Sequence, residues 1–147
     1  GEIKAVSAAV EIAKEMGAKR AVILPVSAPF HCSLLKPAEE KLEKDLDGIE
    51  IKDAAVPVIA NVTAIEETRS EYIKQNLIRQ VSNPVLWEES VKRMIELGAD
   101  TFVEIGPSRT LSGFVKKIDK GATVLNIENL ETLGSALERL EGIKCYS

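Results

Sequence analysis

The chain has 147 residues, of which 45% are hydrophobic and 29% charged, and its formal net charge is -4 at pH 7. This size and composition are those of an ordinary globular protein and exclude the disordered and fibrous classes. The acidic balance argues against nucleic acid as a partner, because nucleic acid selects basic surfaces. No apolar run approaches the ~20 residues of a membrane-spanning helix, so we expect no membrane association.

The cysteines and the start of the chain indicate the compartment. Cys32 and Cys145 lie far apart in the sequence and neither has the spacing of metal ligands, so we expect no metal site. Two isolated cysteines fit a reducing compartment better than a disulfide framework. No charged segment followed by an apolar run opens the chain, as it would in a secretory leader. The sequence therefore predicts a cytoplasmic protein.

Hydrophobic periodicity predicts alternating helices and strands. Asn83, with Pro84 after it, Ser70 and Asn129 are expected to cap helices at their N-terminal ends, and Trp87 is expected in the core. The alternation is typical of an α/β fold with parallel strands and crossover helices. We expect helices over residues 2–17, 34–46, 70–81, 83–98, 108–118 and 131–140, and strands over residues 19–26, 56–61, 101–105 and 122–127.

The only histidine, His31, stands between a predicted strand and a predicted helix that begins near Pro37. Two interpretations are open: a hydrogen-bonded surface residue without chemistry, or a general base at the strand end where α/β folds keep their sites. The positive end of the helix dipole would keep the ring neutral and able to accept a proton. Cys32 is not expected to pair with His31, because adjacent residues on extended backbone point to opposite sides. The charges of the following helix, including Glu39 and Glu40, are expected on a solvated face.

Four blocks of sequence closely resemble the malonyl-CoA:acyl-carrier-protein transacylases of fatty-acid synthesis and the related acyltransferase domains of polyketide synthases. The resemblance covers nearly the whole chain but only the C-terminal half of that family. The blocks are Val26-Ser27-Ala28-Pro29-Phe30-His31-Cys32 with Leu35-Lys36-Pro37-Ala38, then Val56-Pro57-Val58-Ile59-Ala60-Asn61-Val62, Arg79-Gln80-Val81-Ser82-Asn83-Pro84-Val85-Leu86-Trp87, and Glu104-Ile105-Gly106-Pro107.

The resemblance implies a fold and a domain division. Residues 1–26 would form part of a ferredoxin-like small subdomain whose first half is absent from this sequence. Residues 27–147 would form the C-terminal part of an α/β-hydrolase-like acyltransferase body. The missing N-terminal half of the same enzyme would then be a partner of this chain, together with malonyl-CoA and acyl carrier protein.

The resemblance also implies site residues. His31 would be the catalytic base, oriented by the backbone carbonyl of Gln80, while Phe30 and Asn61 would contact the substrate. The bulk of Phe30 matches the malonyl-specific pattern. The reaction would transfer a malonyl group from coenzyme A to the carrier protein by serine–histidine ping-pong chemistry. It would need no cofactor, since the phosphopantetheine is carried by the acyl carrier protein.

One departure from the family changes what this chain is expected to do. The sequence contains no Gly-x-Ser-x-Gly elbow, and Ser27 and Ser33 lack that context, so the nucleophile is absent and the chain alone is expected to be inactive. Two alternatives stay open: a non-catalytic module that binds acyl carrier protein, and a fragment of a polyketide synthase acyltransferase domain. The first would need a basic face, for which Lys116, Lys117 and Lys120 are the candidates.

Overall fold

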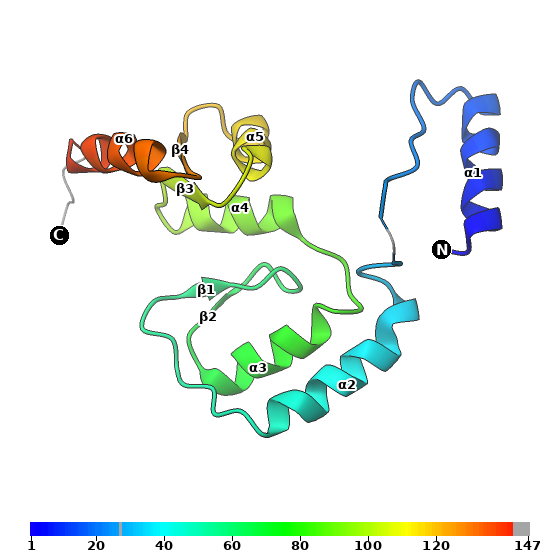
Figure 1. The fold of residues 1–147 in the computed structure, drawn as a ribbon, viewed down its shortest axis with the longest axis horizontal. Helices are drawn as coiled ribbons and strands as arrows, with labels where there is room; N and C mark the ends of the chain where they lie inside the picture. The colour runs from blue at the N-terminus through cyan, green and yellow to red at the C-terminus, as the bar shows by residue number, and fades with distance from the viewer. Residues whose placement is uncertain (27, 143–147) are drawn as a thin grey trace. The chain divides into compact units, whose positions relative to one another are not determined.

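The computed structural model describes residues 1–26 and 28–142, and the chain divides into two compact units at residues 1–85 and 86–147. The fold is α/β, as the sequence predicts (Figure 1). The predicted domain boundary between residues 26 and 27 falls at residue 27, which the structure does not describe, so this boundary stays a prediction. Along the described residues the elements are α1 (Ile3–Glu15), the 3-10 helix η1 (Ser33–Leu35), α2 (Lys36–Asp47), β1 (Val58–Ile59), β2 (Glu66–Glu67), α3 (Ser70–Arg79), α4 (Trp87–Glu96), β3 (Thr101–Ile105), α5 (Thr110–Ile118), β4 (Thr123–Ile127) and α6 (Leu130–Glu141).

The second unit contains the predicted parallel pair of strands. β3 and β4 are parallel, with Thr101 opposite Thr123 and Ile105 opposite Ile127, and α5 makes the crossover between them. β4 runs between α5 and α6 (Figure 1). A crossover helix is the usual way to join parallel neighbours, because a tight turn reverses the chain direction.

The core of the second unit forms where α4 and α5 meet. Val91 is fully buried, and Val115 and Ala122 are each 3% exposed. The predicted core aromatic, Trp87, packs against this cluster. Trp87 and Val91 lie four residues apart on α4, so they share the face of that helix which packs against Val115 of α5. The other partly buried side chains packed on the cluster are Met94, Ile95, Phe102, Ile118 and Val124.

The last helix has the predicted cap. The Asn129 side chain accepts a hydrogen bond from the Thr132 N–H at 2.9 Å, and the Thr132 hydroxyl accepts one from the Asn129 N–H at 3.0 Å. This reciprocal capping satisfies backbone donors that the first turn of a helix cannot pair.

The first unit contains a helix pair and a small hairpin. α2 and α3 pack side by side, and Lys74 on α3 forms a 3.0 Å ion pair with Asp47 at the end of α2 (Figure 1). β1 and β2 form an antiparallel pair in which Val58 lies opposite Glu67. Ala64, with φ of 55°, lies in the turn that joins them.

Two predicted strands of this unit are wrong. Residues 19–26 have no regular secondary structure, and within the described ranges no segment pairs with them. Without a partner for its N–H and C=O groups an apolar run does not make a strand, and Val22, Ile23 and Leu24 are more than half exposed. The strand expected over residues 56–61 shortens to two residues and pairs antiparallel, because the chain turns back at Ala64 and Pro57 cannot donate to a ladder.

Two predicted helix starts also need correction. Ser70 is the first residue of α3 rather than its cap, and its N–H donates at 2.7 Å to Asp53 Oδ1. This hydrogen bond lowers the pKa of Asp53 below its ordinary value. α4 begins at Trp87, later than Asn83, because the Asn83 side chain instead donates at 2.7 Å to the Arg79 carbonyl at the end of α3.

Within the ranges that the structure covers, no helix is long and apolar enough to cross a membrane. Cys145 and Ser27 lie outside the described residues.

Candidate functional site

His31 sits on a tight turn with unusual backbone geometry. Its φ is 57°, in the left-handed region that non-glycine residues seldom adopt. The turn is held by hydrogen bonds from the Phe30 N–H to the Ala28 carbonyl at 2.9 Å and from Cys32 Sγ to the Pro29 carbonyl at 3.1 Å. A left-handed residue costs conformational energy and is often found at functional sites. The Cys32 thiol is thus directed to backbone rather than to the imidazole.

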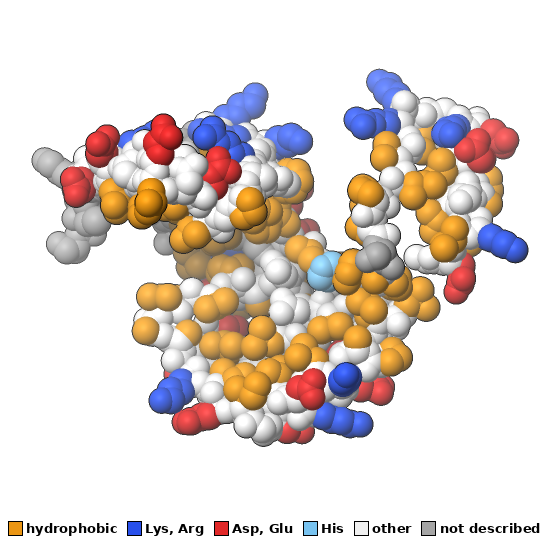
Figure 2. Space-filling model, viewed as in Figure 1, with side chains coloured by type: hydrophobic (Ala, Val, Ile, Leu, Met, Phe, Trp, Pro, Cys, Tyr) orange, Lys and Arg blue, Asp and Glu red, His pale blue; other side chains and the backbone are white. Residues whose placement is uncertain are grey.

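The imidazole is held by one main-chain group from a distant part of the sequence. Nδ1 of His31 lies 3.0 Å from the backbone oxygen of Gln80, the residue that ends α3. The ring remains exposed, and Figure 2 shows it in pale blue at the surface. The structure therefore brings together the two residues that the sequence singled out as a base and its orienting carbonyl.

The Gln80 carbonyl is available for a simple covalent reason. In a continuing helix it would accept from the N–H of the residue four positions later, and that residue is Pro84, which has no N–H. Gln80 itself still donates to the Asn76 carbonyl at 3.0 Å, so the last turn of α3 is intact. Because Pro84 has no N–H to donate, the Gln80 carbonyl is available at the end of α3, and His31 Nδ1 pairs with it.

The pairing defines what the imidazole can do. A carbonyl only accepts, so a neutral ring bonded to it through Nδ1 must carry its proton on Nδ1. Nε2 is then left with its lone pair free to accept a proton. An imidazolium formed there keeps its Nδ1–H bond to the carbonyl.

The two other predicted site residues lie near this pair in different ways. Phe30 precedes His31 on the turn and is 58% exposed. Asn61 and Gln80 line a common hollow of about 190 Å³ between the β1–β2 hairpin and α3. Phe30 does not line that hollow, so the structure brings Asn61, but not Phe30, to its wall. The other residues that line it are Val58, Ile59, Ala60, Glu67, Ile73, Asn76 and Leu77.

The sequence analysis was wrong about Glu39. It is not on the solvated face of α2: the residue is 8% exposed, whereas Glu40 beside it is exposed. The 3.6-residue period places Glu39 close to the apolar stripe of Leu35 and Leu42, which was a signal that the charge could face inward. Hydrogen bonds from Lys36 and then Ser82 lower the pKa of the Glu39 carboxyl, so it is ionised at neutral pH.

Glu104, the first residue of the fourth sequence block, lies near the end of β3 and caps a helix. The Glu104 carboxylate accepts from the Ser112 hydroxyl at 2.5 Å, from the Ser112 N–H at 2.8 Å and from the Leu111 N–H at 3.1 Å. It therefore caps the N-terminal turn of α5 from the preceding strand. These bonds, those from Ser112 first, hold the pKa of Glu104 below its ordinary value.

This cap predicts a pH dependence. A lowered carboxyl pKa contributes stability above the ordinary glutamate value, and that contribution is lost as pH falls through the lowered folded value. We therefore expect Glu104→Gln to reduce the free energy of unfolding at pH 7, and the difference from the parent to shrink at acidic pH. Urea unfolding at several pH values measures it. Glu138→Gln, an exposed change on α6, is the control, and a pH-independent loss in Glu104→Gln would contradict the capping role.

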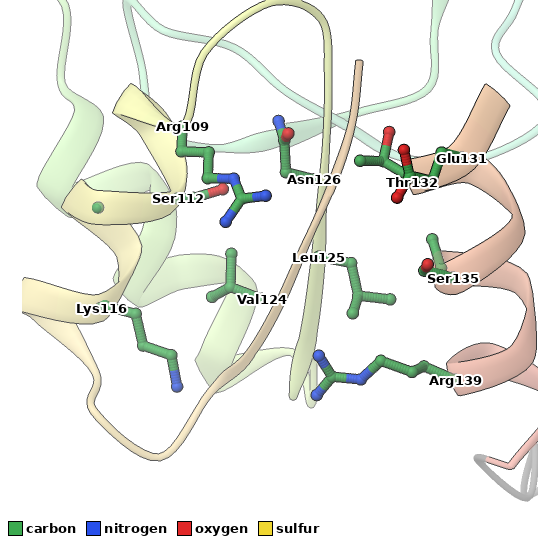
Figure 3. Close-up of a pocket in the computed structure, with 12 residues that line it drawn as sticks. Arg109, Ser112, Lys116, Val124, Leu125, Asn126, Glu131, Thr132, Ser135 and Arg139 are labelled. Carbon is green, nitrogen blue, oxygen red and sulfur yellow. The ribbon is translucent and has the colours of Figure 1, made fainter. Parts of the chain in front are cut away.

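A second hollow, of about 580 Å³, lies in the second unit between α5, β4 and α6. Figure 3 shows Arg109 and Lys116 on one side of it and Arg139 on the other. Lys116 Nζ donates to the Lys120 and Ala122 carbonyls at 3.2 and 2.5 Å, and Lys117 lies over the Phe114 ring at 5.5 Å. Lys116 therefore satisfies carbonyls of the segment that joins α5 to β4.

In the part of the chain that the structure describes, no three His, Cys, Asp or Glu side chains are grouped so as to hold a metal ion.

Comparison with known proteins gives consistent matches. The malonyl CoA-acyl carrier protein transacylase of Bacillus subtilis strain 168 is 48% identical over 141 residues, which are 96% of this chain and 44% of that protein. The protein of the same name from Staphylococcus aureus strain MSSA476 is 43% identical over 122 residues, 83% of this chain and 40% of its own length. No family model matches the chain.

Solved structures agree with the sequence matches. The malonyl CoA-acyl carrier protein transacylase of Clostridium perfringens superposes with a TM-score of 0.89 at 48% identity, covering 97% of this chain and 45% of that one. The malonyl-transacylase PlMCAT, solved with the type II polyketide synthase acyl-carrier protein AntF, superposes with a TM-score of 0.88 at 42% identity, covering 95% of this chain and 45% of that one. The chain spans less than half the length of the relatives it matches. Over nearly all of its own length, this chain is therefore homologous to part of a malonyl CoA-acyl carrier protein transacylase.

Proposed function

We propose that this chain is the C-terminal part of an enzyme that transfers a malonyl group from coenzyme A to acyl carrier protein in fatty-acid biosynthesis. The observation that carries the proposal is the 3.0 Å pairing of His31 Nδ1 with the Gln80 carbonyl, which leaves Nε2 to act as a base. Sequence identities of 43–48% to named transacylases support the same reaction. This chain supplies the histidine, and the rest of the enzyme supplies the nucleophilic serine.

In the first half-reaction, His31 Nε2 accepts the proton of the serine hydroxyl as its oxygen attacks the malonyl thioester carbon. The carbon–sulfur bond then breaks, and the coenzyme A sulfur leaves with the proton that the imidazolium returns. The malonyl group is now an ester on the serine. Through this step the Gln80 carbonyl holds the ring by Nδ1 and stabilises its transient positive charge.

The second half-reaction repeats the proton transfer with the carrier protein. Nε2 accepts the proton of the phosphopantetheine thiol as the sulfur attacks the ester carbon. The carbon–oxygen bond breaks, and the imidazolium returns the proton to the serine oxygen. One base thus serves two acceptors, and no cofactor is consumed.

The test is reconstitution followed by mass spectrometry. We expect the 147-residue chain alone to gain no mass on exposure to malonyl-CoA, since its sequence has no nucleophile elbow. The chain is then mixed with the complementary N-terminal part of the Bacillus subtilis relative, and we expect that part to acquire one malonyl group. Acylation of this chain itself would contradict the division of roles. Binding of acyl carrier protein without any acylation of the mixture would favour a non-catalytic binding module.

Phe30 is proposed to set the preference for malonyl over methylmalonyl groups, and Asn61 to contact the bound acyl group. A bulky ring beside His31 fills the space that an added methyl would need. We expect Phe30→Ser to raise the methylmalonyl-to-malonyl ratio of kcat/KM about 10-fold or more, since one methyl is worth about 1–3 kcal/mol. Competition between the two thioesters in the reconstituted enzyme measures the ratio. Phe114→Ser, on α5 of the other unit, is the control, and an unchanged ratio in Phe30→Ser would remove Phe30 from the acyl pocket.

A further inference from the structure

The buried carboxylate of Glu39 has no role in the chemistry described above, yet it lies beside the segment that carries Gln80. Glu39 is 8% exposed on α2, and Ser82, two residues after Gln80, is 7% exposed. Burying a charge costs free energy unless it is paired and hydrogen-bonded. The partners of this carboxylate therefore indicate what it holds in place.

Both carboxylate oxygens are satisfied. The Ser82 hydroxyl donates a hydrogen bond to Oε2, and Lys36 Nζ lies 2.5 Å from Oε1. The Asn83 side chain continues the network, with Nδ2 at 3.4 Å from Ser82 Oγ and 2.7 Å from the Arg79 carbonyl. A charged acceptor makes the bond to Ser82 stronger than a neutral one would be. The turn over residues 80–83 is thus attached to α2 through Ser82, and the Asn83 side chain ties the same turn to the end of α3.

Two neighbouring hydrogen bonds connect residues 31–39 to residues 80–82. His31 and Glu39 lie on one side, joined by η1 and the first turn of α2, and Gln80 and Ser82 lie on the other, joined by a single residue. The first joins His31 Nδ1 to the Gln80 carbonyl, and the second joins the Glu39 carboxylate to the Ser82 hydroxyl. Because Ser82 is held by Glu39, the Gln80 carbonyl two residues earlier can turn only a limited way from the imidazole.

We propose that Glu39 is a positioning residue: through Ser82 it holds the turn after α3 so that the Gln80 carbonyl meets His31 Nδ1. The inference rests on the proposed roles of His31 and Gln80. Its consequence is that the tautomer of the catalytic ring depends on a carboxylate that touches neither the ring nor the substrate. Loss of this link frees the carbonyl and allows the ring to carry its proton on Nε2, which would remove the base.

The test uses the ring nitrogens of His31, whose signals are unambiguous because the chain has one histidine. Nitrogen-15 NMR of the full chain, at a pH where the ring is neutral, gives the ratio of Nδ1–H to Nε2–H. We expect Nδ1–H to dominate in the parent. Ser82→Ala and Glu39→Ala are each expected to lower the ratio about five- to tenfold, the effect of one hydrogen bond. Glu39→Gln, which keeps an acceptor for Ser82, is expected to lower it less than Glu39→Ala.

Lys74→Ala is the matched control, because it removes the ion pair that links α3 to the far end of α2 without touching the turn at residues 80–83. We expect it to leave the ratio unchanged. If Lys74→Ala and Ser82→Ala lowered the Nδ1–H to Nε2–H ratio equally, the proposal would be overturned. An unchanged ratio in both Ser82→Ala and Glu39→Ala would also overturn it. Circular dichroism identifies any variant that has unfolded; should Glu39→Ala unfold, the milder Ser82→Ala decides.

The spectrum needs neither a nucleophile nor turnover. A reconstituted enzyme that stays inactive while the Glu39 variants shift the tautomer would refute the proposed function and leave this inference standing.

Discussion

Replacing His31 with alanine in the reconstituted enzyme is expected to lower the rate of malonyl transfer about 10²–10⁴-fold, the usual contribution of a positioned general base. The loss should appear in kcat for both half-reactions, because in the proposed mechanism the same nitrogen accepts the serine proton and later the thiol proton. Binding of malonyl-CoA should change little, since the ring acts in the transition state. Rapid-quench measurement of acyl-enzyme formation, followed by transfer to carrier protein, separates the two steps.

The control for this experiment is Cys32→Ser. The thiol donates to the Pro29 carbonyl, and a serine hydroxyl can make the same bond, so the turn around His31 should survive. We expect near-parental activity from Cys32→Ser. If Cys32→Ser were as slow as His31→Ala, the chemistry would run through the thiol. If His31→Ala kept parental activity, the imidazole would be only a surface group, the first interpretation of the sequence.

Val91→Ala is expected to have the largest effect on the stability of the second unit. Val91 is fully buried in the cluster with Val115 and Ala122. Removing two methyl groups and leaving a cavity should cost about 2 kcal/mol of unfolding free energy. Urea unfolding followed by the fluorescence of the chain's one tryptophan, Trp87, reports on the same cluster. The midpoint should fall by roughly 1 M, from the usual slope of small proteins.

The same substitution at Val103, which is 39% exposed on β3, provides the comparison. We expect Val103→Ala to lower the midpoint by clearly less, because less apolar surface leaves water at that position. Equal effects at the two positions would show that Val91 is not at the centre of the core.

Much of the fold could be predicted because local chemistry determines it. The strands 101–105 and 123–127 and the cap at Asn129 lie where apolar runs, spacing and turn residues place them. The sequence around His31 also identified the ring and the carbonyl with which it pairs, through a resemblance that covers four separate blocks. These features depend on residues that are close together in the chain or on motifs that can be matched one residue at a time.

Other features could not be predicted, since they depend on what each segment meets. The apolar run at residues 19–26 has the composition of a strand but no paired neighbour in the described residues, so its backbone stays irregular. Asn83 has the chemistry of an N-cap, yet its side chain serves the end of α3 instead. In both cases the residue types are compatible with the predicted structure, but tertiary packing determines which hydrogen-bond partners the segment meets.

The sequence by itself predicted the α/β class and, through the family resemblance, the pairing of His31 with the Gln80 carbonyl that the structure contains. Only the tertiary structure decided that Glu39, which has the composition of a surface residue on α2, is buried against Ser82. The physical reason is that periodicity gives the direction of a side chain on its own helix, whereas its burial and pairing depend on a segment 43 residues away. The hydrogen bond between Ser82 and Glu39 exists only once α2 and α3 have packed together.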